Sequence, residues 1–101
     1  LLYRKENKMT TVERALNSIG KKCFIDYYED FRSCTDKNTL SQKLLANNKN
    51  ATSLLAQMTR INYAKWIFDN NEEKEALTII INSNRLDDVT RKKAREFFNS
   101  L

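Results

Sequence analysis

The middle of the chain, residues 38–68, reads NTLSQKLLANNKNATSLLAQMTRINYAKWIF. Its first half carries apolar residues at the spacing of one helix face, namely Leu40, Leu44 and Leu45. Asn38 is placed to cap this helix. The run 47–50 is rich in asparagine, which tolerates the left-handed backbone conformations of turns. A longer helix begins at Asn50 or Thr52, so the stretch predicts a helical hairpin over 38–69.

The second helix of the hairpin is predicted to be amphipathic. On a helical wheel of 51–69 the large apolar residues gather in one arc: Leu54, Leu55, Met58, Ile61, Trp66 and Phe68. The opposite arc holds small and polar residues: Thr52, Ser53, Ala56, Thr59, Arg60 and Tyr63. We therefore expect the first arc to pack in the core and the second to face outward.

The flanks of the hairpin also carry helical patterns. Thr10 and Glu13 form a capping box before apolar residues that recur by threes and fours up to Phe31. Gly20 interrupts this segment, which can be one helix or two. After the hairpin, acidic residues that suit a helix N-terminus lead from Asn70 or Asn71 to Ile81. Its end, 78–81, is β-branched and could form a strand, but a lone strand lacks a partner, so we expect helix.

The last helix is predicted to begin at an Asp87 cap. We expect one face of it to join the core: Val89, Ala94, Phe97, Phe98 and Leu101. The fold class is then all-α, a compact bundle of four to five short helices with a helix-turn-helix-like hairpin in the middle. Residues 1–9 are treated as a tail and 10–101 as a single helical domain, since about 100 residues suffice for one core.

Composition excludes several function classes. The 101 residues include one glycine, no proline and no histidine. A hairpin-rich β fold and glycine-rich phosphate loops both need more glycine. Without histidine, the Ser-His and Cys-His nucleophile pairs and histidine zinc sites are also excluded. We therefore expect no enzymatic activity, no cofactor and no metal site.

The two cysteines and the apolar runs indicate where the chain works. Cys23 and Cys34 would lie about 16 Å apart on one helix, too far for a disulfide, so free thiols are expected. The longest purely apolar run, 79–81, is far shorter than a membrane span or a signal peptide core. These features favour a cytoplasmic protein that does not enter the membrane.

Charge is distributed unevenly. The formal charge is +5, and no Asp or Glu occurs from Lys37 to Phe68. We call residues 37–68 the acid-free span. A polyanion such as DNA would match this surface, although an ordinary solvated surface of lysine and asparagine explains it equally.

Helix, turn and helix within the acid-free span resemble the outline of the helix-turn-helix motif, over about 30 residues. The resemblance implies DNA binding through the 38–69 hairpin. The base-reading residues would be Thr52, Ser53, Ala56 and Arg60, and the phosphate-binding residues Lys43, Lys49 and Arg95. The turn lacks the usual glycine and is longer than the tight form, so an exposed helix surface of small residues is the alternative.

A second hypothesis assigns the chain to protein interactions. The chain would then be an interaction module or an oligomerising regulatory subunit, for example a homodimer, without nucleic-acid binding. The face of the long helix with Ala56, Tyr63 and Ile67 would meet the partner. Two further clusters have structural explanations: an acidic face of Asp26, Glu29 and Asp30, and an aromatic group of Phe24, Tyr27, Tyr28 and Phe31 that we expect in the core.

Overall fold

The computed structural model describes residues 11–47 and 53–101, and all regular structure in these two ranges is α-helical. The helices are α2 (Val12–Ile19), α3 (Lys21–Asp26), α4 (Tyr28–Arg32), α5 (Lys37–Asn47), α6 (Leu54–Asp69), α7 (Glu73–Ile81) and α8 (Asp88–Asn99). The all-α prediction is confirmed. The predicted tail, residues 1–9, and the predicted Thr10 cap lie outside the described residues.

The first helical segment is divided more finely than expected. Gly20, with φ of 92°, ends α2 by donating its N–H to the Leu16 carbonyl, and it starts α3 by accepting from the Phe24 N–H. Tyr27, at φ −119° and ψ 25°, separates α3 from α4. The described residues thus form seven helices, five of them of eight residues or more, where we expected four or five in all.

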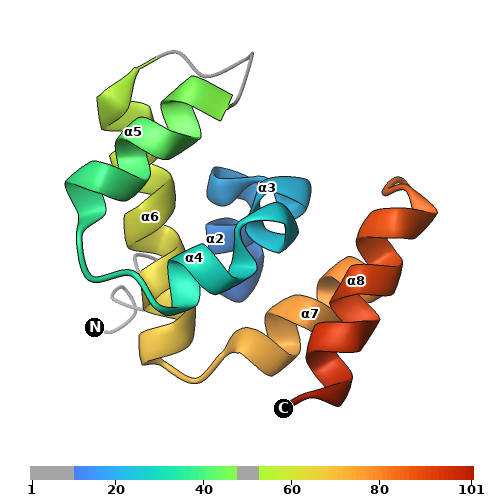
Figure 1. Ribbon diagram of the computed structural model, residues 1–101. Helices are drawn as coiled ribbons and strands as arrows, with labels where there is room; N and C mark the ends of the chain where they lie inside the picture. The colour runs from blue at the N-terminus through green and yellow to red at the C-terminus, as the bar shows by residue number, and fades with distance from the viewer. Residues whose placement is uncertain (1–10, 48–52) are drawn as a thin grey trace, which may run out of the picture.

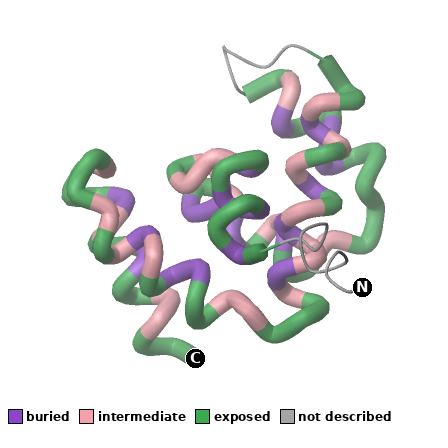
Figure 2. Tube along the Cα trace, turned by 180° about the vertical axis from the view of Figure 1, so that it is seen from behind, coloured by how far each residue is buried: buried purple, intermediate pink, exposed green. Residues whose placement is uncertain are grey.

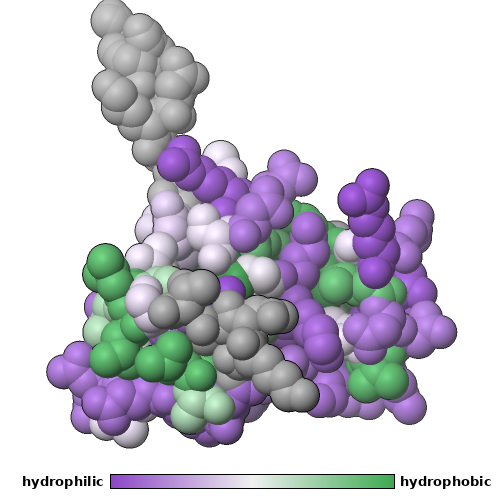
Figure 3. Space-filling view, turned by 90° about the horizontal axis from the view of Figure 1, so that it is seen from above, coloured by the Kyte–Doolittle hydropathy of each residue, from purple (hydrophilic) through white to green (hydrophobic). Residues whose placement is uncertain are grey.

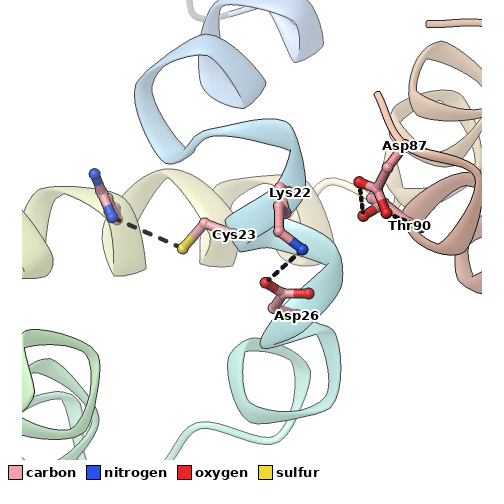
Figure 4. A network of polar contacts seen from close by, with 6 residues as sticks. Lys22, Cys23, Asp26, Asp87 and Thr90 are labelled. Carbon is pink, nitrogen blue, oxygen red and sulfur yellow. Dashed lines mark hydrogen bonds and ion pairs between the residues drawn. The ribbon is translucent and has the colours of Figure 1, made fainter. Parts of the chain in front are cut away.

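Helix starts are set by short polar side chains. Thr11 caps α2 by accepting from the Arg14 N–H at 3.1 Å. Asp36, rather than the predicted Asn38, caps α5, because its Oδ1 accepts from the N–H groups of Asn38 and Thr39. Asp87 caps α8 as predicted, accepting from the Thr90 N–H at 3.1 Å (Figure 4).

Helix α6 is the centre of the fold. Helices α2, α5 and α4 pack on it from different sides, while α7 and α8 pair with each other and α8 also contacts α3 (Figure 1). Segment 78–81, the possible strand, is the end of α7. Buried positions follow the inner sides of the helices (Figure 2). The side of α6 that these helices leave uncovered forms part of the outer surface of the α5–α6 hairpin.

The aromatic group of the first segment lies in the core, as expected for most of its members. Phe24, Tyr28 and Phe31 are each at most 3% exposed, and Tyr27 packs against the core from a partly buried position. The Tyr28 ring stacks on Phe97 of α8 with centroids 4.1 Å apart. This stacking joins the α7–α8 pair to the rest of the bundle. A stacking platform for bases would need these rings at the surface.

Two predicted core positions of the last helix are wrong. Val89 is 65% exposed and Leu101 is 59% exposed. Ala94 is fully buried, and Phe97 and Phe98 pack against the core from partly buried positions. Helix α8 lies at the edge of the fold against α7 and α3, so its buried face is narrower than the apolar pattern suggests.

Candidate functional site

The described residues predicted to read bases differ in exposure, because Ser53 is exposed whereas Arg60 is partly buried. Ser53 is the N-cap of α6, and its side chain oxygen accepts from the Ala56 N–H at 3.0 Å. Ala56 is partly exposed, and Thr52 lies outside the described residues. The Ser53 hydroxyl therefore has a structural role at the start of the helix, as most serine caps do.

Arg60 is directed towards α3. Its Nη1 donates to Cys23 Sγ at 3.9 Å, and the residue is partly buried (Figure 4). Burial raises the pKa of the Cys23 thiol, and the nearby Arg60 charge opposes part of that increase. The guanidinium thus packs between two helices, which leaves it poorly placed to reach a base edge.

The predicted phosphate-binding residues are separated in space. Lys43 on α5 forms an ion pair with Asp30 at 3.2 Å, and Lys49 lies outside the described residues. Arg95 is exposed on α8, which packs on α7 and α3, whereas α5 packs on α6 (Figure 1). Lys43 and Arg95 therefore lie on helices that belong to different packed pairs.

The apolar arc predicted for α6 is corrected by the structure. Leu55 is 78% exposed and Leu54 is 46% exposed, although both were expected in the core. Ile61 of the predicted arc is fully buried, and Trp66 and Phe68 pack against the core from partly buried positions. Gln57, Ala64 and Ile67 complete the buried side. Because α2, α4 and α5 pack on α6 from several sides, small and polar residues fill contact positions that a hydropathy wheel assigns to the surface. The proposed interface residue Ile67 is fully buried and cannot meet a partner.

The outward face of α6 carries an open groove. Leu55, Thr59, Asn62 and Trp66 follow one another at helical spacing, on the side opposite the buried residues. The groove has a volume of about 350 Å³ and is lined by Thr59, Asn62, Tyr63 and Trp66. We call these four residues the α6 groove. Figure 3 shows a hydrophobic patch on the side of the molecule that holds the α5–α6 hairpin. Leu54 and Leu55, at the start of α6, are exposed.

Two hydrogen bonds set the polar character of the α6 groove. Lys37 Nζ, from the first turn of α5, donates to Asn62 Oδ1 at 2.8 Å. The amide NH₂ of Asn62 is then the group left to donate. Thr59 Oγ1 donates to the Leu55 carbonyl at 3.1 Å. The groove therefore combines two aromatic walls with hydrogen-bond donors along one rim.

Tyr63 was expected on the outward arc, and Trp66 was expected to pack inside. Both pack against the core from partly buried positions, and their exposed parts line the same groove. The helical spacing of 59, 62, 63 and 66 is the signal for this face in the sequence, but hydrophobicity favours a core position for Leu55, which is exposed.

The acidic face of the first segment is neutralised by neighbouring cations. Asp26 pairs with Lys22 at 3.5 Å, Glu29 with Arg32 at 2.6 Å, and Asp30 with Lys43 (Figure 4 for the first pair). Within 11–47 and 53–101, no three or more Cys, Asp or Glu side chains are grouped so as to hold a metal ion. Cys23 and Cys34 are both free thiols.

None of the described helices is both long enough and apolar enough to cross a membrane. Comparison of the chain with protein-family models, with curated proteins and with solved structures finds no match. Any functional assignment consequently depends on the surface of the molecule itself.

Proposed function

We propose that this chain is a protein-interaction module that binds a partner segment in the α6 groove. The observation that carries the proposal is the coincidence, on one helix face, of two partly exposed aromatic rings, Tyr63 and Trp66, with an open groove. Tryptophan and tyrosine are the residues most enriched at the energetic centres of interfaces, because they combine a large apolar area with a polar tip.

Leu55 extends this face by one helical turn. A single exposed leucine needs no explanation in a globular protein. Here, however, Leu55 lies four residues before Thr59 on the same side of α6, and 78% of it is exposed. A partner that covers the groove and this turn would bury Leu55 together with the exposed parts of Tyr63 and Trp66, and it would also meet the polar Thr59 and Asn62 between them. Complete burial of a leucine side chain is worth about 1.5–3 kcal/mol.

DNA binding by the 38–69 hairpin remains a prediction, and we place it second. The acid-free span favours it, since its described charges, Lys37, Lys43, Arg60 and Lys65, are all positive. Against it, Arg60 contacts Cys23 and Lys43 pairs with Asp30. Duplex binding that weakens steeply with salt, and whose salt slope flattens in Lys43→Ala, would support this second candidate.

A peptide-library selection tests the interaction module. Peptides are selected on the wild-type chain and then measured on two matched double variants. Leu55→Gln/Thr59→Gln alters the α6 face. Val89→Gln/Thr78→Gln alters α8 and α7, where Val89 is also exposed and Thr78 makes the same bond to the carbonyl four residues earlier, at 2.9 Å.

We expect selected peptides to bind the α6-face variant about tenfold more weakly, which corresponds to about 1.4 kcal/mol, and the control variant with unchanged affinity. Failure to enrich any peptide, or equal losses on the two variants, would refute the proposed function.

A further inference from the structure

The charges and donors around the α6 groove define the chemistry of its partner. We infer that the partner is a peptide segment that places an apolar side chain in the groove and an Asp or Glu beside it. This inference rests on the proposed function and adds the identity of the ligand class.

The first argument is the charge of the surrounding surface. No acidic residue occurs from Lys37 to Phe68, which includes the whole of α5 and all of α6 except its last residue. Asp36 and Asp69 bound this span. Asp36 is engaged at the start of α5, where Oδ1 accepts from two backbone N–H groups and Oδ2 accepts from the Thr39 hydroxyl at 2.7 Å. Asp69 is exposed and is the last residue of α6.

The second argument is the local geometry at the rim. Lys37 Nζ lies 2.8 Å from Asn62 Oδ1, and Asn62 lines the groove. An ammonium group has three N–H donors, and this bond uses one of them. The Lys37 ammonium and the Asn62 amide therefore offer donors side by side. A carboxylate next to the groove can accept from both, and hydrogen bonds between charged groups are roughly twice as strong as neutral ones.

The aromatic walls require an apolar neighbour for that carboxylate. The rings of Tyr63 and Trp66 present apolar faces that a charged head alone cannot cover. A side chain such as Leu, Ile or Phe fits this requirement. The partner segment is accordingly amphipathic, with an apolar anchor in the groove and acidic residues towards Lys37.

The same charges argue against two other occupants. A symmetric dimer brings the same patch of both copies together, so two acid-free spans would face each other in a chain of net charge +5. The first ten residues of this chain have three basic side chains and one acidic side chain. Their positive charge does not complement Lys37. An acidic segment from another protein satisfies both the charge and the apolar requirement.

Trp66 provides a built-in reporter, because it is the only tryptophan in the chain. Three synthetic peptides without tryptophan or tyrosine are titrated into the full-length protein, and Trp66 emission is recorded. They share one pattern of Leu and Phe anchors and differ only in the flanking residues, which are Glu, Gln or Lys. Burial of the indole by an anchor shifts its emission to shorter wavelength.

We expect the Glu peptide to bind best and the Lys peptide least, with the difference shrinking as salt rises. Lys37→Gln should reduce the preference for Glu over Gln flanks by about two- to fivefold. Lys93→Gln, which removes an exposed charge from α8, should not change it. Thr59→Glu adds a negative charge to the groove, so it should weaken binding of the Glu peptide well beyond the loss caused by the uncharged Thr59→Gln. At the control position on α7, Thr78→Glu and Thr78→Gln should have the same effect on binding.

Several results would overturn the inference. Equal affinity of the Glu and Gln peptides at all salt concentrations would reject the acidic partner while leaving the proposed function intact. A library selection that yields basic peptides whose binding is weakened by the α6-face variant would have the same consequence. A peptide of residues 1–10 that shifts Trp66 emission and displaces the Glu peptide would assign the groove to the chain itself. A mass that rises with concentration would assign it to a second copy, and displacement by duplex DNA would assign it to nucleic acid.

Discussion

Replacement of Gly20 by alanine isolates the cost of one backbone conformation. Gly20 is the only glycine of the chain, and its φ of 92° and ψ of 125° lie in a region that L-residues rarely adopt. An added Cβ would meet nothing closer than Cys23 Cβ at 3.7 Å, which is ordinary contact. The cost of Gly20→Ala is therefore conformational rather than steric, and we expect about 1–3 kcal/mol of lost stability.

The measurement is thermal unfolding followed by circular dichroism at 222 nm. For a chain of this size, about 1 kcal/mol corresponds to about 4–8 °C, so Tm should fall by about 5–20 °C. Ser18→Ala, at an exposed position in the last turn of α2, is the matched control and should leave Tm unchanged or slightly raised. A Gly20→Ala variant as stable as the control would show that the positive φ is not required, and the division between α2 and α3 would lose its explanation.

Three further predictions concern packing, pH and thiol reactivity. Ile61→Ala should cost about 2–5 kcal/mol in urea unfolding because Ile61 is fully buried, while Leu55→Ala should change stability by less than about 0.5 kcal/mol; a loss for Leu55→Ala as large as that for Ile61→Ala would place Leu55 in the core. Hydrogen bonds from Thr90 lower the pKa of Asp87, so its stabilising contribution should be complete above the unfolded carboxyl pKa of about 3.9 and be lost as pH falls through the lower folded value. Asp87→Ala should therefore flatten the acid limb of a stability–pH curve, and an unchanged limb would contradict the cap. Burial raises the pKa of Cys23, so in a Cys34→Ser variant its reaction with a disulfide reagent at pH 8 should accelerate on denaturation, and an equally fast native reaction would place the thiol at the surface.

Local signals in the sequence predicted the helical elements well. Asp87 begins α8 as expected, because a short acidic side chain before an apolar pattern can satisfy free backbone N–H groups. Gly20 breaks the first segment, because only glycine accepts its conformation cheaply. The structure places the cap of α2 at Thr11, one residue after the predicted Thr10, and the cap of α5 at Asp36, two residues before the predicted Asn38.

The location of the candidate site could not be predicted in the same way, because it depends on how many neighbours each helix has. Hydropathy favours a core position for Leu55 and a surface position for Gln57, but Leu55 is 78% exposed. In the fold, Gln57 is fully buried and its Nε2 donates to the Ser53 carbonyl at 3.3 Å. Packing by α2, α4 and α5 on α6 determines this orientation. The pairing of Lys37 with Asn62, 25 residues away, is likewise a product of tertiary structure.

The most direct test of the account is an NMR titration of the full-length, ¹⁵N-labelled chain with the Glu-flanked peptide. The account predicts that shifts concentrate on the amides of Leu55, Thr59 and Asn62 and on the indole N–H of Trp66, while α8 remains unperturbed. Shifts that map to Arg95 and the rest of α8, or an unperturbed Trp66 indole at saturation, would contradict the claim that the outward face of α6 is the binding surface.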